Sequence, residues 1–161
     1  MEISLKSQRA SPPYATANIR KAVENGLNYQ GVCGGAFFAS TSPGYDRLKL
    51  TSGVRFGFYS AGTRKAAVPI TVVGAPIPDQ YWADGRQLTG WGAVIGKYPD
   101  GTPAIAEGIF GLGSVLLVGV HAEAPANWRH GMNFTSPAEL DNAYAETLIQ
   151  AALNGQSLPH Y

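Results

Sequence analysis

The spacing of apolar and polar positions predicts alternating helices and strands in the first quarter of the chain. Apolar residues recur at helical spacing within residues 15–25, and Gly26 follows where a helix C-cap glycine is expected. The segment 27–32 is mostly apolar and predicts a short strand. It continues through Cys33-Gly34-Gly35 into a helix-like apolar run at 36–39. This region therefore predicts a strand, a sharp glycine turn and a helix.

The rest of the chain predicts further strands and a long helix. In chain order, the expected strands are 54–59, 70–73, 92–98, 103–110 and 114–120. The last of these is almost continuously apolar, as expected for a strand that is buried on both faces. Ser136-Pro137-Ala138-Glu139 has the sequence of a capping box, with proline at the first helical position, and predicts a helix that ends at Gly155.

Composition narrows the class of protein. The chain has 161 residues, of which 45% are hydrophobic and 14% charged, and this favours one globular domain. We expect a tail or linker remnant at residues 1–13 and a single domain at 14–161. A formal net charge of +1 argues against a nucleic-acid or membrane-surface partner. The segment 1–6 lacks the apolar core of a secretory signal, and 115–120 is too short to span a bilayer. We therefore expect a cytoplasmic protein.

The only cysteine lies in Gly31-Val32-Cys33-Gly34-Gly35, a sequence that suits a nucleophile on a sharp strand-to-helix turn. Small neighbours are needed there because the strained turn packs closely. A helix N-terminus favours the reactive thiolate, and the N–H of Gly34 would face a developing oxyanion. A single cysteine forms neither an internal disulfide nor a multi-cysteine zinc site, and we expect no metal or cofactor. The alternative is an inert cysteine at a tight turn.

A second group of polar residues follows the apolar strand 114–120. His121 comes directly after this strand and Glu123 two residues later. Functional groups in α/β sheets collect beyond the carboxyl ends of strands, which is also where Cys33 would lie. A histidine there can act as the base for the thiol, and the carboxylate can hold the imidazole in the required tautomer. A surface histidine beside an acidic residue is the alternative interpretation.

Gly-x-Cys-x-Gly, followed much later by an apolar strand and Gly-x-His-x-Glu, resembles class I glutamine amidotransferase-like domains. The likeness is greater to the branch found as the N-terminal domain of some biotin–protein ligases and in stand-alone relatives. It covers about residues 18–153 and is carried mainly by 19–40 and 94–129. The resemblance implies a flavodoxin-like α/β sheet flanked by helices, here with an antiparallel β extension.

The resemblance also implies roles for individual residues. Cys33 would be the nucleophile, His121 the base and Glu123 the group that orients it. The oxyanion and substrate pocket would comprise Gly34, Gly35, Phe37, Trp128 and Arg129. The implied function is a cysteine hydrolase or amidase that acts on an unknown small amide.

Three departures from the family pattern keep a second function open. Phe37 stands where glutamine amidotransferases place a substrate-contacting glutamine, and Ala122 replaces the usual proline between histidine and glutamate. The family's opening strands have no counterpart before Ala15, so we expect a homo-oligomer or a partner chain to cover the region that these strands occupy. The alternative function is a non-catalytic binding or regulatory module. A peptidase or deglycase is disfavoured, because such relatives commonly place histidine where Gly34 stands.

Overall fold

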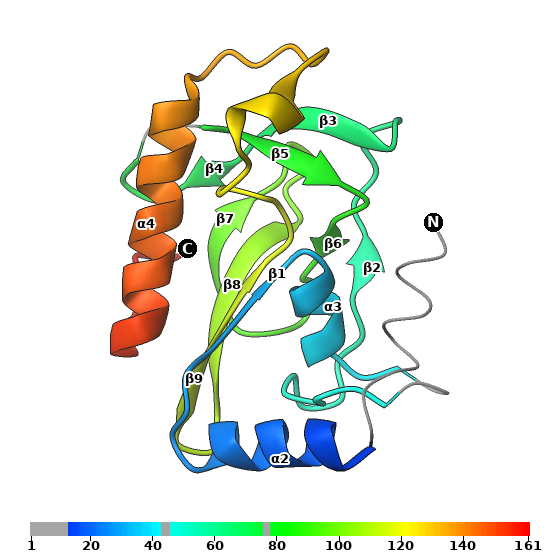
Figure 1. The fold of residues 1–161 in the computed structure, drawn as a ribbon, viewed down its shortest axis with the longest axis vertical. Helices are drawn as coiled ribbons and strands as arrows, with labels where there is room; N and C mark the ends of the chain where they lie inside the picture. The colour runs from blue at the N-terminus through cyan, green and yellow to red at the C-terminus, as the bar shows by residue number, and fades with distance from the viewer. Residues whose placement is uncertain (1–12, 43–45, 76–77) are drawn as a thin grey trace.

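A five-stranded mixed sheet forms the centre of the fold (Figure 1). The computed structural model describes residues 13–42, 46–75 and 78–161. In chain order, the described elements are α2 (Pro13–Glu24), β1 (Tyr29–Val32), α3 (Gly34–Ala39), β2 (Gly57–Phe58), β3 (Lys65–Pro69), β4 (Thr71–Val72), β5 (Asp79–Ala83), β6 (Arg86–Gln87), β7 (Ala93–Lys97), β8 (Pro103–Phe110), β9 (Gly113–Val118), the short 3-10 helix η1 (Ala126–Arg129) and α4 (Ala138–Asn154).

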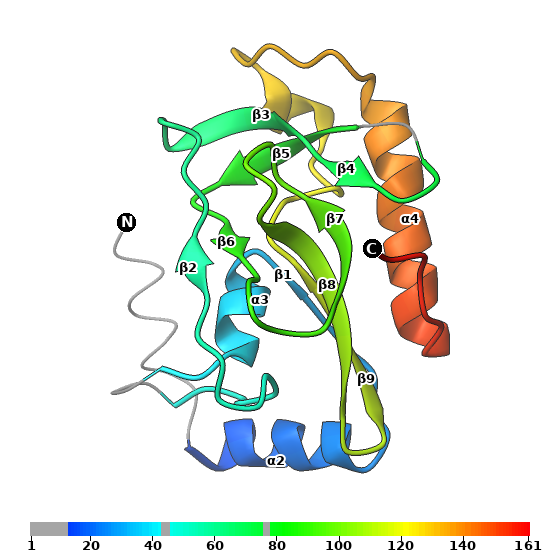
Figure 2. The same cartoon turned by 180° about the vertical axis from the view of Figure 1, so that it is seen from behind.

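The strand order of the central sheet is β1-β9-β8-β7-β4. β1 pairs with β9 in parallel, whereas β9, β8, β7 and β4 are joined by antiparallel pairing. Two antiparallel ribbons, β2–β6 and β3–β5, accompany this sheet, and Figure 2 shows them from behind. The one parallel pair matters most for the site, because it brings the carboxyl ends of β1 and β9 to the same edge.

Apolar side chains of β9 fill both faces of the sheet. Val115 and Leu117 belong to the core that includes residues of α3, whereas Leu116 and Val118 belong to the core that includes residues of α4. Successive strand residues point to opposite faces, so α3 and α4 cover opposite sides of the sheet (Figure 1). This explains why the β9 sequence is nearly continuously apolar.

The structure confirms the predicted mixed α/β architecture and most of its elements. The helix near residue 20, the strand–turn–helix around Cys33 and the three strands between 92 and 120 are all present. In the middle of the chain only two-residue strands lie within the expected segments 54–59 and 70–73. There, β3 and β5 were not expected, because neither alternates regularly between buried and exposed positions.

The predicted capping box at Ser136 is wrong. Pro137 is the N-cap residue of α4, and no side-chain hydrogen bond caps this helix. The Ser136 hydroxyl is used elsewhere: it accepts a hydrogen bond from the Asp79 N–H at 2.9 Å and donates one to Asp141 at 3.2 Å. The predicted end of the helix is confirmed, since Gly155 has φ 59° and closes α4 in the left-handed conformation.

The predicted tail at 1–13 lies outside the described residues except for Pro13, where α2 begins. Among the described helices, none combines the length and apolar character needed to cross a membrane.

Gly31 offers a test of how closely β1 and α3 pack. A Cβ at Gly31 would lie 2.7 Å from the backbone carbonyl carbon and oxygen of Gly35. Because neither group is at the end of a flexible side chain, we expect Gly31→Ala to lower the free energy of unfolding by about 1–3 kcal/mol. Urea denaturation measures this difference.

Gly34→Ala is the matched control, because a Cβ at Gly34 would meet no atom within 4 Å. It should stay within about 0.5 kcal/mol of the wild type. Equal stability of the two variants would contradict close packing at Gly31.

Candidate active site

Cys33 lies on a strained turn between β1 and α3. Its φ is 49° and its ψ is −102°, a conformation that is rare for a residue with a side chain. Two backbone hydrogen bonds hold the turn. The Cys33 N–H donates to the carbonyl oxygen of Val118 at 2.7 Å, and the Cys33 carbonyl accepts from the N–H of Phe37 at 3.2 Å. The first of these bonds ties the nucleophile candidate directly to the end of β9.

His121 follows β9 at the same edge of the sheet. The Gly119 N–H donates to the carbonyl oxygen of Ala104, and the His121 N–H donates to that of Tyr81, both at 2.8 Å. A Cβ at Gly119 would lie 2.2 Å from the carbonyl oxygen of Arg86, so only glycine allows this close approach. These contacts fix the backbone of His121 beside β5 and that of Gly119 beside β6 and β8.

Cys33, His121 and Glu123 lie at the same edge of the sheet, beyond the ends of β1 and β9. The Nδ1 atom of His121 lies 2.7 Å from Oε1 of Glu123. Cys33 lies close enough to the imidazole to raise the pKa of His121. The Cys33 Sγ is 3.5 Å from the carbonyl oxygen of Ala83, to which a protonated thiol can donate. The three residues singled out from separate motifs in the sequence are therefore neighbours in the fold, and we call them the polar group.

The electrostatics of His121 follow from these partners. Burial alone would lower the pKa of His121, but its interactions with Cys33 and with the Glu123 carboxylate raise it to about 9. Burial raises the pKa of Glu123, yet the hydrogen bond and positive charge of His121 outweigh this and lower it. At neutral pH the imidazole is therefore protonated and the carboxylate ionised.

An open hollow adjoins His121, and we call it the His121 hollow. It is lined by Lys65, Tyr81, Ala83, His121, Asn127, Trp128, His130 and Met132. The rings of Tyr81 and Trp128 lie 5.7 and 5.6 Å from the imidazole, centroid to centroid, and 5.4 Å from each other. Trp128, predicted from the resemblance, thus lies beside His121.

Gly34 and Gly35 occupy the start of α3. Gly34 is exposed, and as the first residue of the helix its N–H has no carbonyl partner one turn earlier. It is therefore the candidate oxyanion donor. Gly35 has a structural contact as well, because its carbonyl accepts a hydrogen bond from the Tyr29 hydroxyl at 2.9 Å.

Phe37 packs between two arginines. The guanidinium carbons of Arg47 and Arg86 lie 3.1 and 3.7 Å from the centre of its ring. Neither arginine was singled out in the sequence. Both lie in segments without a regular apolar period, and Arg86 lies in a two-residue strand, so the sequence holds no pattern that would have placed them near Cys33.

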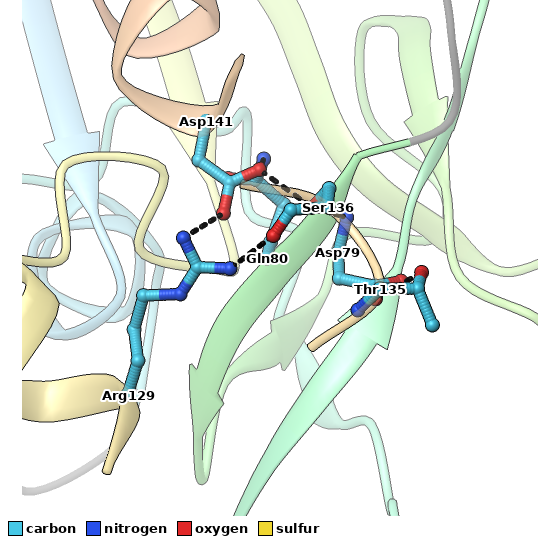
Figure 3. A network of polar contacts seen from close by, with 6 residues as sticks. All are labelled: Asp79, Gln80, Arg129, Thr135, Ser136 and Asp141. Carbon is cyan, nitrogen blue, oxygen red and sulfur yellow. Dashed lines mark hydrogen bonds and ion pairs between the residues drawn. The ribbon is translucent and has the colours of Figure 1, made fainter. Parts of the chain in front are cut away.

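Arg129 is not among the residues that line the His121 hollow. Figure 3 shows its guanidinium directed at Asp141 of α4. The Arg129 Nη1 lies 3.6 Å from the Asp141 carboxylate, and Nη2 donates to the carbonyl oxygen of Ser136. Burial raises the pKa of Asp141 to about 6, even though Arg129 and Ser136 lower it. Arg129 therefore anchors the loop after η1 to α4.

No metal site accompanies this group: in the described part of the chain, no three histidine, cysteine or acidic side chains gather to hold an ion. No model of a known protein family matches the chain, and no curated protein matches it.

The coupling between His121 and its neighbours can be measured directly. We expect the pKa of His121 to be about 9 in the wild type, and lower in both Cys33→Ala and Glu123→Gln, since each variant removes a group that raises it. A histidine NMR titration measures all three values. Because folding raises this pKa, the stabilisation from His121 is complete below its unfolded value of 6.5 and is lost as the pH rises through about 9. A wild-type pKa near 6.5 would contradict the contact.

Proposed function

We propose that the chain is a cysteine-dependent amidase or hydrolase domain that acts on a small amide. The observation that carries this proposal is the polar group described above: a cysteine on a strained strand-to-helix turn, near a histidine whose Nδ1 lies 2.7 Å from a glutamate. In this proposal, Cys33 is the nucleophile, His121 is the general acid and base, and Glu123 orients His121.

The first half of the reaction forms a thioester. The Cys33 thiolate attacks the amide carbonyl carbon, a C–S bond forms, and the carbonyl π electrons move onto the oxygen. The N–H of Gly34 stabilises this oxyanion. Because the pKa of His121 is raised to about 9, the imidazolium is available at neutral pH to protonate the leaving nitrogen. The C–N bond then breaks and the amine departs.

The second half of the reaction hydrolyses the thioester. Neutral His121 accepts a proton from a water molecule, and the resulting hydroxide equivalent attacks the thioester carbon. The C–S bond breaks, the carboxylic acid is released, and Cys33 returns to the thiolate with His121 protonated. The open hollow beside His121 provides room for a substrate and for this water.

The resemblance to class I glutamine amidotransferase-like domains agrees with this proposal, and we propose a flavodoxin-like sheet on the same grounds. The parallel pairing of β1 and β9 supports it, as does the location of α3 and α4 on opposite faces. In this proposal, the antiparallel strands β8, β7 and β4 would form the β extension.

A non-catalytic binding module is the second candidate function. Phe37 favours it, because an apolar ring packed between two guanidinium groups cannot hydrogen-bond a glutamine side chain. The two functions differ in one measurable property, the reactivity of the Cys33 thiol.

We expect alkylation of Cys33 by iodoacetamide at neutral pH to depend on His121. A hydrogen bond to a charged group is worth about 1.5–3 kcal/mol, so His121→Ala should slow the reaction by about 10- to 100-fold. Glu123→Gln should slow it less, because the carboxylate acts through the imidazole. Mass spectrometry of the intact chain over time measures the rates.

His160→Ala is the matched control for the loss of a histidine, since His160 bonds the carbonyl of Leu158 and lies outside the polar group. Its labelling rate should equal that of the wild type. Unchanged rates in both His121→Ala and Glu123→Gln would favour the binding module.

β1 leads us to propose a homo-oligomer or a complex with a partner chain. This strand is at one end of the strand order in the described sheet, and an apolar groove that includes Val32, Leu148 and Ile149 lies between it and α4. Unpaired strand edges favour association. Sedimentation velocity of the full chain at low micromolar concentration should show a species larger than a monomer. A monomer with a concentration-independent thermal transition would contradict self-association.

A further inference from the structure

Arg86 is a buried arginine close to the proposed nucleophile. Its residue is 9% exposed, and the charge of Cys33 acts on its guanidinium. Within residues 13–42, 46–75 and 78–161, no acidic side chain forms an ion pair with Arg86. Arg129, by contrast, is paired with Asp141. A buried charge is costly unless a counter-charge accompanies it, so Arg86 has the property expected of a group that receives a charged ligand.

The surroundings of Arg86 leave only some of its donors occupied. Its guanidinium carbon is 3.7 Å from the ring centre of Phe37 and 3.5 Å from that of Phe58, so the rings cover its planar faces. Nη1 donates to the carbonyl oxygen of Phe56 at 3.3 Å. A guanidinium has five N–H donors in its plane. The other N–H donors of Arg86 lie in the same plane, as the two oxygens of a carboxylate require.

The backbone of Arg86 is anchored to the elements that carry the polar group. The Tyr98 hydroxyl donates to the carbonyl oxygen of Arg86 at 2.8 Å, and Gly119, two residues before His121, packs against the same oxygen. Ala83, three residues before Arg86, has its carbonyl oxygen 3.5 Å from Sγ of Cys33. Arg86 is thus positioned by the segments that also position the nucleophile and its base.

Electrostatics around Arg86 favour an anion as well. Burial lowers the pKa of Arg86 to about 10, and the positive charge of Arg47 contributes to this decrease, whereas the charge of Cys33 opposes it. Arg47 and Arg86 contact the ring of Phe37 together. A bound anion would offset both the burial of Arg86 and its repulsion by Arg47.

We propose that Arg86 binds a carboxylate of the substrate, so that the Cys33 site is selective for small amides that carry a negative charge near the amide group. This inference rests on the proposed function for the reaction, but the selectivity itself depends on the charge of Arg86. Charge attraction would draw the substrate toward Cys33, and the planar donors would fix its orientation.

Two alkylating reagents of similar size test the proposal. Iodoacetate carries a carboxylate, and iodoacetamide carries a neutral amide in its place. We expect the ratio of the iodoacetate rate to the iodoacetamide rate at Cys33 to fall by about 10-fold in Arg86→Gln, as expected for loss of a charge-assisted hydrogen bond. The ratio is measured within one variant, so a general change in thiol reactivity cancels.

Lys21→Gln is the matched control, because it removes the same formal charge from an exposed position on α2. Its ratio should equal that of the wild type. Arg86→Lys keeps the charge without the planar donors, and should give an intermediate ratio. An equal ratio in the wild type and Arg86→Gln, or equal decreases in Arg86→Gln and Lys21→Gln, would overturn the proposal.

A measurement on the wild type covers the case in which Arg86→Gln does not fold. At constant ionic strength, succinate should slow labelling by iodoacetamide in a saturable manner, whereas succinamide should not. Equal effects of the two compounds would overturn the inference. Failure of the proposed function has a different signature, namely iodoacetamide rates that do not depend on His121 or Glu123.

Discussion

The parallel pairing of β1 with β9 is the constraint on which the rest of the site depends. These strands are far apart in the sequence, and their register aligns Val32 with Val118, the last residue of each strand. The chain then turns at Cys33 after one strand and reaches His121 shortly after the other. The Cys33 N–H donates to the Val118 carbonyl oxygen at 2.7 Å, so the ladder extends into the turn itself. A shift in this register would move the thiol away from the imidazole.

Glycines at two positions allow backbone segments to pack closely against the ends of β1 and β9. The Gly35 carbonyl packs against Gly31, and the Arg86 carbonyl packs against Gly119. A Cβ atom at either glycine would clash with the carbonyl group that packs there. Close approach has a conformational cost, because Cys33 is held at a positive φ of 49°. The surrounding hydrogen bonds and the buried β9 side chains on both faces offset that cost. The strained conformation of Cys33 is thus held in place by its neighbours in the sheet.

The sequence predicts the parts of the fold and site that depend on local pattern. Cys33, His121 and Glu123 were found because small residues and apolar strands precede them directly in the chain. Arg86 and Tyr81 could not be found in this way, since β5 and β6 lack a regular period and their location depends on tertiary pairing. The direction of the Arg129 side chain could not be predicted for a related reason. It adjoins Trp128 in sequence, but its side-chain direction is set by Asp141, which lies on a distant helix.

Phe37 changes how a substrate would be recognised at this site. In the family that the sequence resembles, a glutamine side chain at this position contacts the substrate, which is a directional interaction of short range. Here the aromatic ring cannot hydrogen-bond an amide, but it separates two guanidinium groups whose carbons lie 3.1 and 3.7 Å from its centre. The ring stabilises this positive pair through cation–π contacts. Under the proposed function, the loss of a polar contact at Phe37 would therefore be accompanied by a gain of positive charge beside it, and recognition would depend on the attraction of an anion instead of on amide hydrogen bonding.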